Sequence, residues 1–201
     1  MKLTDRVFIA LFFVVQAMWA GSYIVGHFVV RELDPFATVQ VRYSIAALTM
    51  FPLLLLFFRK QKPNFHERGW WVHTFAVTVT SGVIYQVLFF ASLKYISPTT
   101  TALIYALNPF FTSFGEVVFL KQRRSTRFYI GFLFAFVGAM WVIFARGGHL
   151  DFSHLGIGEG LAFAAALMWS TYTLLARATK KPEWNPLWIS GFNYLFTALP
   201  R

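Results

Sequence analysis

Long apolar stretches dominate the chain and follow one another with only short polar gaps. Seven of them cover residues 7–30, 36–58, 71–93, 98–120, 128–145, 157–176 and 187–200. A membrane core about 30 Å thick is crossed by about 20 apolar residues of helix. The first four stretches exceed that length, and the last three are shorter or less distinct. The pattern predicts an all-α polytopic membrane protein of about seven transmembrane helices, with gaps too short for a soluble domain.

Positive charge alternates along the gaps. Lys and Arg gather at the N-terminus and in every second gap, namely 59–70, 121–127 and 177–186, whereas the other gaps carry one each. Positive residues accumulate on the cytoplasmic side of membrane proteins. The N-terminus and these three gaps are therefore predicted to face the cytoplasm.

Composition narrows the function classes. The chain is 57% hydrophobic with a formal net charge of +10, and a basic balance of this kind suggests nucleic acid in a soluble protein. Here the charge flanks the apolar stretches, so we expect the lipid bilayer and not nucleic acid as the partner. The absence of cysteine excludes disulfides and thiol ligands. His149, Asp151 and His154 have metal-like spacing, but a solvated loop explains them better, and we expect no metal or cofactor.

Short sequence similarities recur at a fixed distance. Three pairs match at an offset of 150 or 151 residues: Met18-Trp19 with Met168-Trp169, Pro35 with Pro186, and residues 41–43 with 192–194. The offset covers five stretches, an odd number, so the two copies must cross the membrane in opposite directions. Inverted repeats are typical of transporters, with the substrate site at the repeat interface. The second copy lacks three stretches, so the chain is interpreted as partial; the alternative is a genuine seven-span protein.

Three segments resemble one known family. They are LDPFATVQVRY at 33–43, SPTTTALIYALNPFF at 97–111 and RRSTRFYIGFLFAFVGAMWV at 123–142. Together they are similar to the EamA-type members of the drug/metabolite transporter superfamily. One difference is Gln122, at a position where the family often has an acidic residue.

The resemblance implies a ten-span fold of two inverted five-helix repeats, truncated here to about seven helices. Residues 1–150 would form the first repeat, and residues 151–201 would begin the second. It also implies a multi-pass protein of the cell inner membrane that exports small metabolites or drugs. The substrate, the coupling ion and the oligomeric state stay open, a homodimer included.

Polar side chains inside the apolar stretches are candidates for chemistry, because they are costly in hydrocarbon and usually face a wet interior. In the fourth stretch they recur every three or four residues and share one helical face: Thr101, Tyr105, Asn108, Thr112 and Glu116. Similar stripes mark the first and third stretches: Gln16, Trp19, Tyr23 and His27; Thr74, Thr78, Ser81 and Tyr85. The stripes favour either a shared polar cavity or hydrogen bonds between helices.

Six residues are predicted to bind the substrate: Trp19, Tyr23, Arg42, Tyr105, Asn108 and Glu116. Trp19 and Tyr23 offer an aromatic wall with a polar edge. Tyr105 and Asn108 adjoin the helix break predicted at Pro109. Arg42 would favour a carboxylate or phosphate, unless it extends to the membrane interface. Glu116 is a weaker candidate, since an interfacial salt bridge with Lys121 explains it equally well.

The other aromatic and small residues receive structural roles. Trp70, Trp71, Trp184 and Trp188 are expected at the cytoplasmic membrane boundary, in contact with lipid headgroups. Gly131 and Gly138 are expected to permit close helix packing.

The sequence thus predicts a membrane transporter that moves a small molecule by alternating access. The alternative is a non-transporting subunit or an inactive fragment that acts only through helix association. An enzyme is not expected, because the chain has no paired acids, histidine cluster or phosphate-binding loop of the known motifs.

Overall fold

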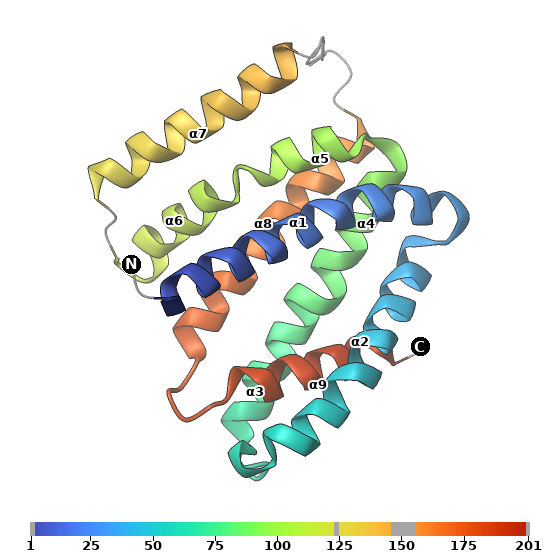
Figure 1. Ribbon diagram of the computed structural model, residues 1–201, viewed down its shortest axis with the longest axis vertical. Coiled ribbons are helices and arrows are strands. Elements are labelled where there is room, and N and C mark those ends of the chain that lie inside the picture. Colours follow the sequence, from blue (N-terminus) through green and yellow to red (C-terminus); the bar gives the residue numbers. More distant parts are fainter. Residues whose placement is uncertain (1–2, 123–124, 146–155, 200–201) are drawn as a thin grey trace.

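The computed structural model describes residues 3–122, 125–145 and 156–199, and these residues form helices joined by short connections (Figure 1). The elements are α1 (Leu3–Glu32), α2 (Pro35–Phe57), η1 (Arg59–Gln61), α3 (Arg68–Val77), η2 (Thr78–Ile84), α4 (Tyr85–Tyr95), α5 (Pro98–Tyr105), α6 (Asn108–Phe119), α7 (Thr126–Ala145), α8 (Ile157–Thr179) and α9 (Pro186–Ala198). The third apolar stretch is α3, η2 and α4 end to end, and the fourth is α5 followed by α6. The all-α prediction is confirmed, and five segments are long and apolar enough to cross a membrane.

Three helices begin with the same local device. Asp34, Ser97 and Asn185 each accept a hydrogen bond through a side-chain oxygen from a backbone N–H in the first turn that follows. A proline comes next in each case, and its fixed φ suits the first helical position. These caps set the starts of α2, α5 and α9. At α8, by contrast, no proline follows the N-cap, and the helix begins at Ile157 within the glycine-rich residues 156–160.

Contacts between connections show how the helices run. Lys181 pairs with Glu67, and Asn185 Nδ2 lies 2.6 Å from Gln61 Oε1, so two of the basic gaps lie at the same end of the bundle. At the other end, His27 near the end of α1 lies 2.8 Å from the carbonyl oxygen of Leu93. The start of α8 packs against Tyr95 and Ile96 at that same end. Helices α1 and α8 are therefore antiparallel.

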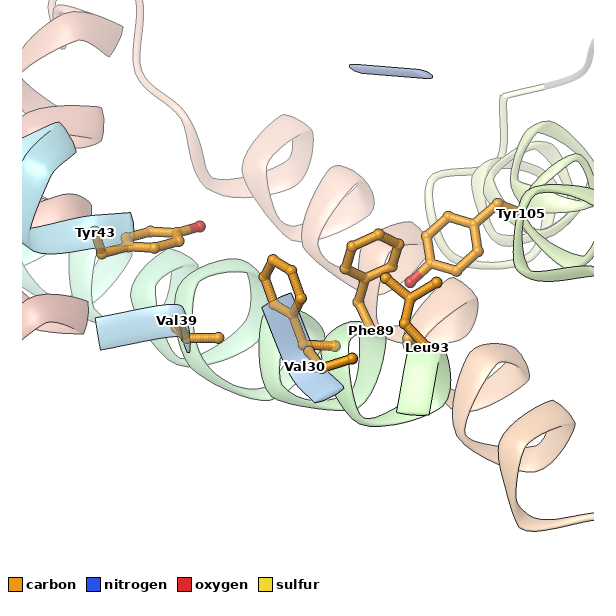
Figure 2. Close-up of a cluster of buried hydrophobic side chains, with 8 residues drawn as sticks. Val30, Val39, Tyr43, Phe89, Leu93 and Tyr105 are labelled. Atoms are coloured by element: carbon orange, nitrogen blue, oxygen red, sulfur yellow. The ribbon is translucent and has the colours of Figure 1, made fainter. Parts of the chain in front are cut away.

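The bundle has two apolar cores. α4 packs against α1, α2 and α8, and α2 packs against α9. One core gathers Val30, Val39, Tyr43, Phe89 and Leu93 around α4 (Figure 2). The second core contains Trp70, Trp184 and Trp188, each less than 5% exposed. The expectation that these three tryptophans face lipid headgroups is wrong, because they fill the space between α2, α3 and α9.

α7 is the least attached helix of the described chain. It lies at the rim of the bundle, and Phe132 stacks on Phe110 of α6 with ring centroids 5.8 Å apart (Figure 1). Gly131 and Gly138 were expected to allow close packing, but a Cβ at either would meet nothing within 4 Å. Most described side chains of α7 are exposed, which leaves this helix to lipid or to other protein.

Candidate functional site

A cavity of about 310 Å³ lies among α1, α2, α4, α8 and the junction of α5 with α6. The described residues that line it are Trp19, Ser22, Tyr23, Arg42, Tyr85, Gln86, Phe89, Tyr105, Ala106, Asn108, Pro109 and Trp169. Five of the six predicted site residues are in this set, and they come from two distant parts of the sequence, α1–α2 and α5–α6. Glu116 is the exception.

The broken fourth span forms one wall of the cavity. α5 ends at Tyr105 and α6 begins at Asn108, with Ala106 and Leu107 in a turn between them. Pro109 has no N–H to donate, so a regular helix cannot continue through this point. The break places Tyr105 and Asn108 at the cavity. Asn108 Oδ1 and the Tyr105 hydroxyl are buried without a hydrogen bond of ordinary geometry to the described residues, although the Tyr85 hydroxyl lies near that of Tyr105.

Arg42 supplies the positive charge of the lining. Its Nη1 donates to Gln86 Oε1 at 3.5 Å, a long hydrogen bond, and its guanidinium carbon lies 5.7 Å from the centre of the Phe90 ring. A guanidinium has five N–H donors, so most of its capacity remains for another group. His27 of α1 forms its described hydrogen bonds elsewhere, with Leu93 and Arg31.

Aromatic rings make up most of the remaining wall. Tyr23 meets Phe89 and Tyr105 edge to face, with ring centroids 5.1 and 5.9 Å apart. Trp169 lies 4.9 Å from Tyr85 and 5.6 Å from Trp19 between ring centroids. The Tyr23 contacts and the Trp19–Trp169 contact are close to perpendicular, a favourable ring geometry, and the Tyr85–Trp169 contact is tilted. They build a rigid apolar wall around the few polar groups.

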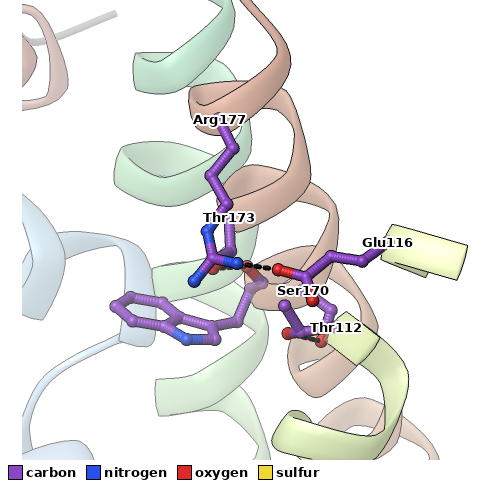
Figure 3. Close-up of polar contacts among 6 residues, drawn as sticks. Thr112, Glu116, Ser170, Thr173 and Arg177 are labelled. Carbon is purple, nitrogen blue, oxygen red and sulfur yellow. Dashed lines mark hydrogen bonds and ion pairs between the residues drawn. The ribbon is translucent and has the colours of Figure 1, made fainter. Parts of the chain in front are cut away.

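Glu116 lies outside the cavity, at the contact between α6 and α8. Figure 3 shows its carboxylate paired with the guanidinium of Arg177, with Thr112 and Ser170 one turn away. The Thr112 and Ser170 hydroxyls are 3.3 Å apart. The Glu116 side chain is fully buried whereas that of Arg177 is half exposed. The ion pair that the structure shows is thus with α8 and joins two helices that are distant in sequence.

A second cavity, of about 480 Å³, lies between α3 and α8 at the end with the basic gaps. Its polar groups come from Arg68, His73 and Thr179, and His73 Nδ1 already lies 2.5 Å from Thr179 Oγ1. None of the buried, unpartnered side-chain atoms of the described chain belongs to its lining. The smaller cavity therefore has the stronger features of a binding site.

Comparison with known proteins identifies the family. The model of the EamA-like transporter family matches residues 7–144, more than half of the chain. The chain belongs to the EamA-like transporter family. An uncharacterized transporter of Bacillus subtilis, YyaM, is 30% identical over 89% of this chain and 56% of its own length. A WAT1-related protein of Arabidopsis thaliana is 28% identical over 73% of this chain and 45% of its own length.

This EamA-like chain spans about half the length of the curated relatives it matches. No solved structure matches the chain significantly. The matched family is one of transporters, and the five long apolar segments of the described chain are those of a multi-pass membrane protein. His149, Asp151 and His154 lie outside the described residues.

Gln86, Phe89 and Ser22 of this EamA-like chain line the cavity without having been singled out from the sequence. The predicted stripe in the third span, Thr74 to Tyr85, assumed a regular α-helix. The structure instead has a π-helical segment at Thr78–Ile84, whose wider turns change the direction of the side chains after it. Ser81 therefore faces α9, and Tyr85 and Gln86 face the cavity. No periodicity in the sequence marks this change.

Proposed function

We propose that the cavity lined by Trp19, Tyr23, Arg42, Tyr105 and Asn108 is the substrate site of a transporter that exports a small metabolite or drug. The observation that carries this proposal is the cavity itself. It combines a cation, a rigid aromatic wall and buried polar atoms without partners at the break of a membrane helix. Broken helices near the bilayer midplane are typical of transporter sites.

The mechanism we propose is alternating access between two inverted repeats, residues 1–150 and a second repeat that begins in 151–201. Two ring contacts support this arrangement. Trp19 meets Trp169, and Tyr43 meets Tyr194 at 5.5 Å between ring centroids. Both pairs are related by the sequence offset of 150 or 151 residues. Contacts between equivalent residues are what a two-fold axis produces, and the cavity adjoins the Trp19–Trp169 pair.

Flux measurements test the proposal. The complete open reading frame that encodes these 201 residues is reconstituted in proteoliposomes and supplied with a panel of small solutes. Asn108→Ala should reduce flux without lowering the amount of protein in the membrane. Thr171→Ala is a matched control, because Thr171 is an exposed residue of α8 that does not line the cavity. Equal flux in both variants would remove the cavity from the mechanism, and the same vesicles in both orientations establish the direction.

We also propose that the N-terminus and the basic gaps face the cytoplasm, on the inner membrane of a cell. Reporter fusions after Gln61 and Lys180 should score as cytoplasmic, and fusions after Asp34 and Ser97 as external. One of these four on the wrong side would contradict the proposed orientation.

A further inference from the structure

We propose that the substrate is an aromatic monocarboxylate that carries a hydrogen-bond donor on its ring, and not a zwitterion or a cation. This inference rests on the proposed function, because it names the class of molecule that the same cavity transports. Four features of the cavity support it: its charge, the shape of its wall, its unpartnered polar atoms and its volume.

The charge of the lining selects an anion. Arg42 is the charged side chain among the described residues that line the cavity, and no Asp or Glu is among them. A single guanidinium at an apolar site is best neutralised by one carboxylate, which its planar fork can bind through two hydrogen bonds. The ammonium group of an amino acid would find no carboxylate in this lining. The charge therefore favours a monoanion over a zwitterion.

The wall selects a flat apolar body. The rings of Tyr23, Phe89 and Tyr105 pack edge to face with centroids 5.1 to 5.9 Å apart, and Tyr85 and Trp169 extend the same wall. A planar ring can contact such a wall with its faces and edges. An aromatic cage also attracts organic cations, but here the charge of Arg42 repels them.

One of the two buried polar atoms in the lining requires a donor from the ligand. Asn108 Oδ1 is an acceptor only, and the Tyr105 hydroxyl can both donate and accept. Buried polar groups are costly unless they are hydrogen-bonded. A hydroxyl group on the aromatic ring would satisfy Asn108 and stand beside Tyr105 while the carboxylate reaches Arg42. The volume of about 310 Å³ is at the small end of ligand pockets, which suits a single substituted ring.

Binding to a matched set of ligands tests the class. The protein from the complete open reading frame is placed in lipid nanodiscs and titrated calorimetrically with four ring compounds and one amino acid. The compounds are 4-hydroxybenzoate, 4-methoxybenzoate, 4-hydroxybenzyl alcohol, 4-hydroxybenzylamine and tyrosine. We expect 4-hydroxybenzoate to bind about tenfold or more tightly than each of the others, because a site built for a polar group rejects ligands that leave it unpaired.

Variants assign each preference to its side chain. Arg42→Gln should abolish the preference for the carboxylate over the alcohol and leave the preference for hydroxyl over methoxy. Asn108→Leu should do the reverse. Arg31→Gln should keep both preferences, since Arg31 lies at the end of α1 above Phe28 and outside the cavity. If the two residues had only a structural role, each variant would weaken the binding of all ligands and would not remove one preference alone.

The outcomes separate this inference from the proposed function. Tighter binding of the amine, the alcohol or tyrosine would overturn the monocarboxylate class, and so would failure of all five to bind. If another solute is then carried, and its flux falls in Asn108→Ala, the transporter proposal stands without this class. If no solute of a broad panel is carried or bound, the proposed function fails as well.

Discussion

Arg42 and Asn193 occupy corresponding positions of α2 and α9, 151 residues apart, and have different surroundings. Each precedes a tyrosine, and those two tyrosines, Tyr43 and Tyr194, are in contact. Each also contacts the third span: Arg42 reaches Gln86 at 3.5 Å, and Asn193 Nδ2 donates to Ser81 Oγ at 3.3 Å. The two residues therefore have matching neighbours, namely a tyrosine of the contacting pair and the third span.

The two side chains differ in burial and in hydrogen bonding. Asn193 is 8% exposed, and its amide is engaged at both ends, because its Oδ1 also accepts from Thr197. Arg42 is exposed and has one long hydrogen bond beside its contact with the Phe90 ring. The difference teaches that a polar residue in a span can serve packing at one place and recognition at its counterpart. Sequence position alone does not distinguish the two.

The largest effect is expected at Gly82, where α9 packs against the third span. A Cβ at Gly82 would collide with Thr197 Oγ1 and Asn193 Oδ1. Gly82→Val should therefore lower the free energy of unfolding by about 3 kcal/mol, as overpacking does in close-packed interiors. The measurement is the thermal unfolding midpoint in detergent. Gly160→Ala is the control, because a Cβ there meets nothing within 4 Å; equal midpoints for the two variants would contradict the close approach.

Smaller effects are expected for substitutions of Asn193 and Arg42: the first should mainly lower stability, and the second should mainly lower flux. Asn193→Ala removes buried hydrogen bonds and should cost about 1–2 kcal/mol of stability, with flux per folded molecule unchanged. Arg42→Gln should change stability by less than about 0.5 kcal/mol, because Arg42 is exposed and its hydrogen bond is long. It should reduce flux per molecule about tenfold for an anionic substrate. Thermal unfolding and flux are measured on the same preparations. If both variants lose stability equally, the division of roles proposed for them is wrong.

The contact between the two tyrosines should give a measurable coupling energy. Tyr43 and Tyr194 meet at an interplanar angle of 80°, and such pairs contribute about 0.5–1.5 kcal/mol beyond buried area. A double-mutant cycle with Tyr43→Leu and Tyr194→Leu should return a value in that range. Additive losses would mean that the two rings do not stabilise each other.

The smallest effect is expected at the connection outside the membrane. Hydrogen bonds from Lys181 and Trp184 lower the pKa of Glu67 below its usual range, and the Glu67 carboxylate raises the pKa of Lys181. A lowered folded-state pKa adds stability that is present above the unfolded pKa and is lost as pH falls through the folded value. Wild type should therefore be slightly more stable than Glu67→Gln at neutral pH, and this difference in the free energy of unfolding should disappear at acidic pH. The difference should also shrink in high salt, because exposed ion pairs are screened; a difference that stays constant below pH 4 would contradict the assignment.

The sequence predicted most of the helices because membrane spans are specified locally, by length and apolar content. It also predicted five cavity residues, since a polar side chain in a span usually faces the bundle interior or a water-filled cavity. It could not predict that Glu116, on the same predicted face as Tyr105 and Asn108, pairs with Arg177 outside the cavity. Such partners depend on how α6 docks on α8. The tryptophans were misplaced for the same reason, since a large ring near the membrane surface suits lipid headgroups and a helix contact equally.

The π-helical segment at Thr78–Ile84 makes the third span sensitive to its length at one point. An α-helix turns about 100° per residue, so deleting one residue within the segment would rotate everything after it by roughly that angle. The shortened span would still be long enough to cross the bilayer. Ser81 and Gln86 could then no longer face Asn193 and Arg42 at the same time. A one-residue deletion here should thus give a protein that inserts normally but whose third span can no longer contact α2 and α9 at the same time. Hydrophobicity alone would not reveal this outcome.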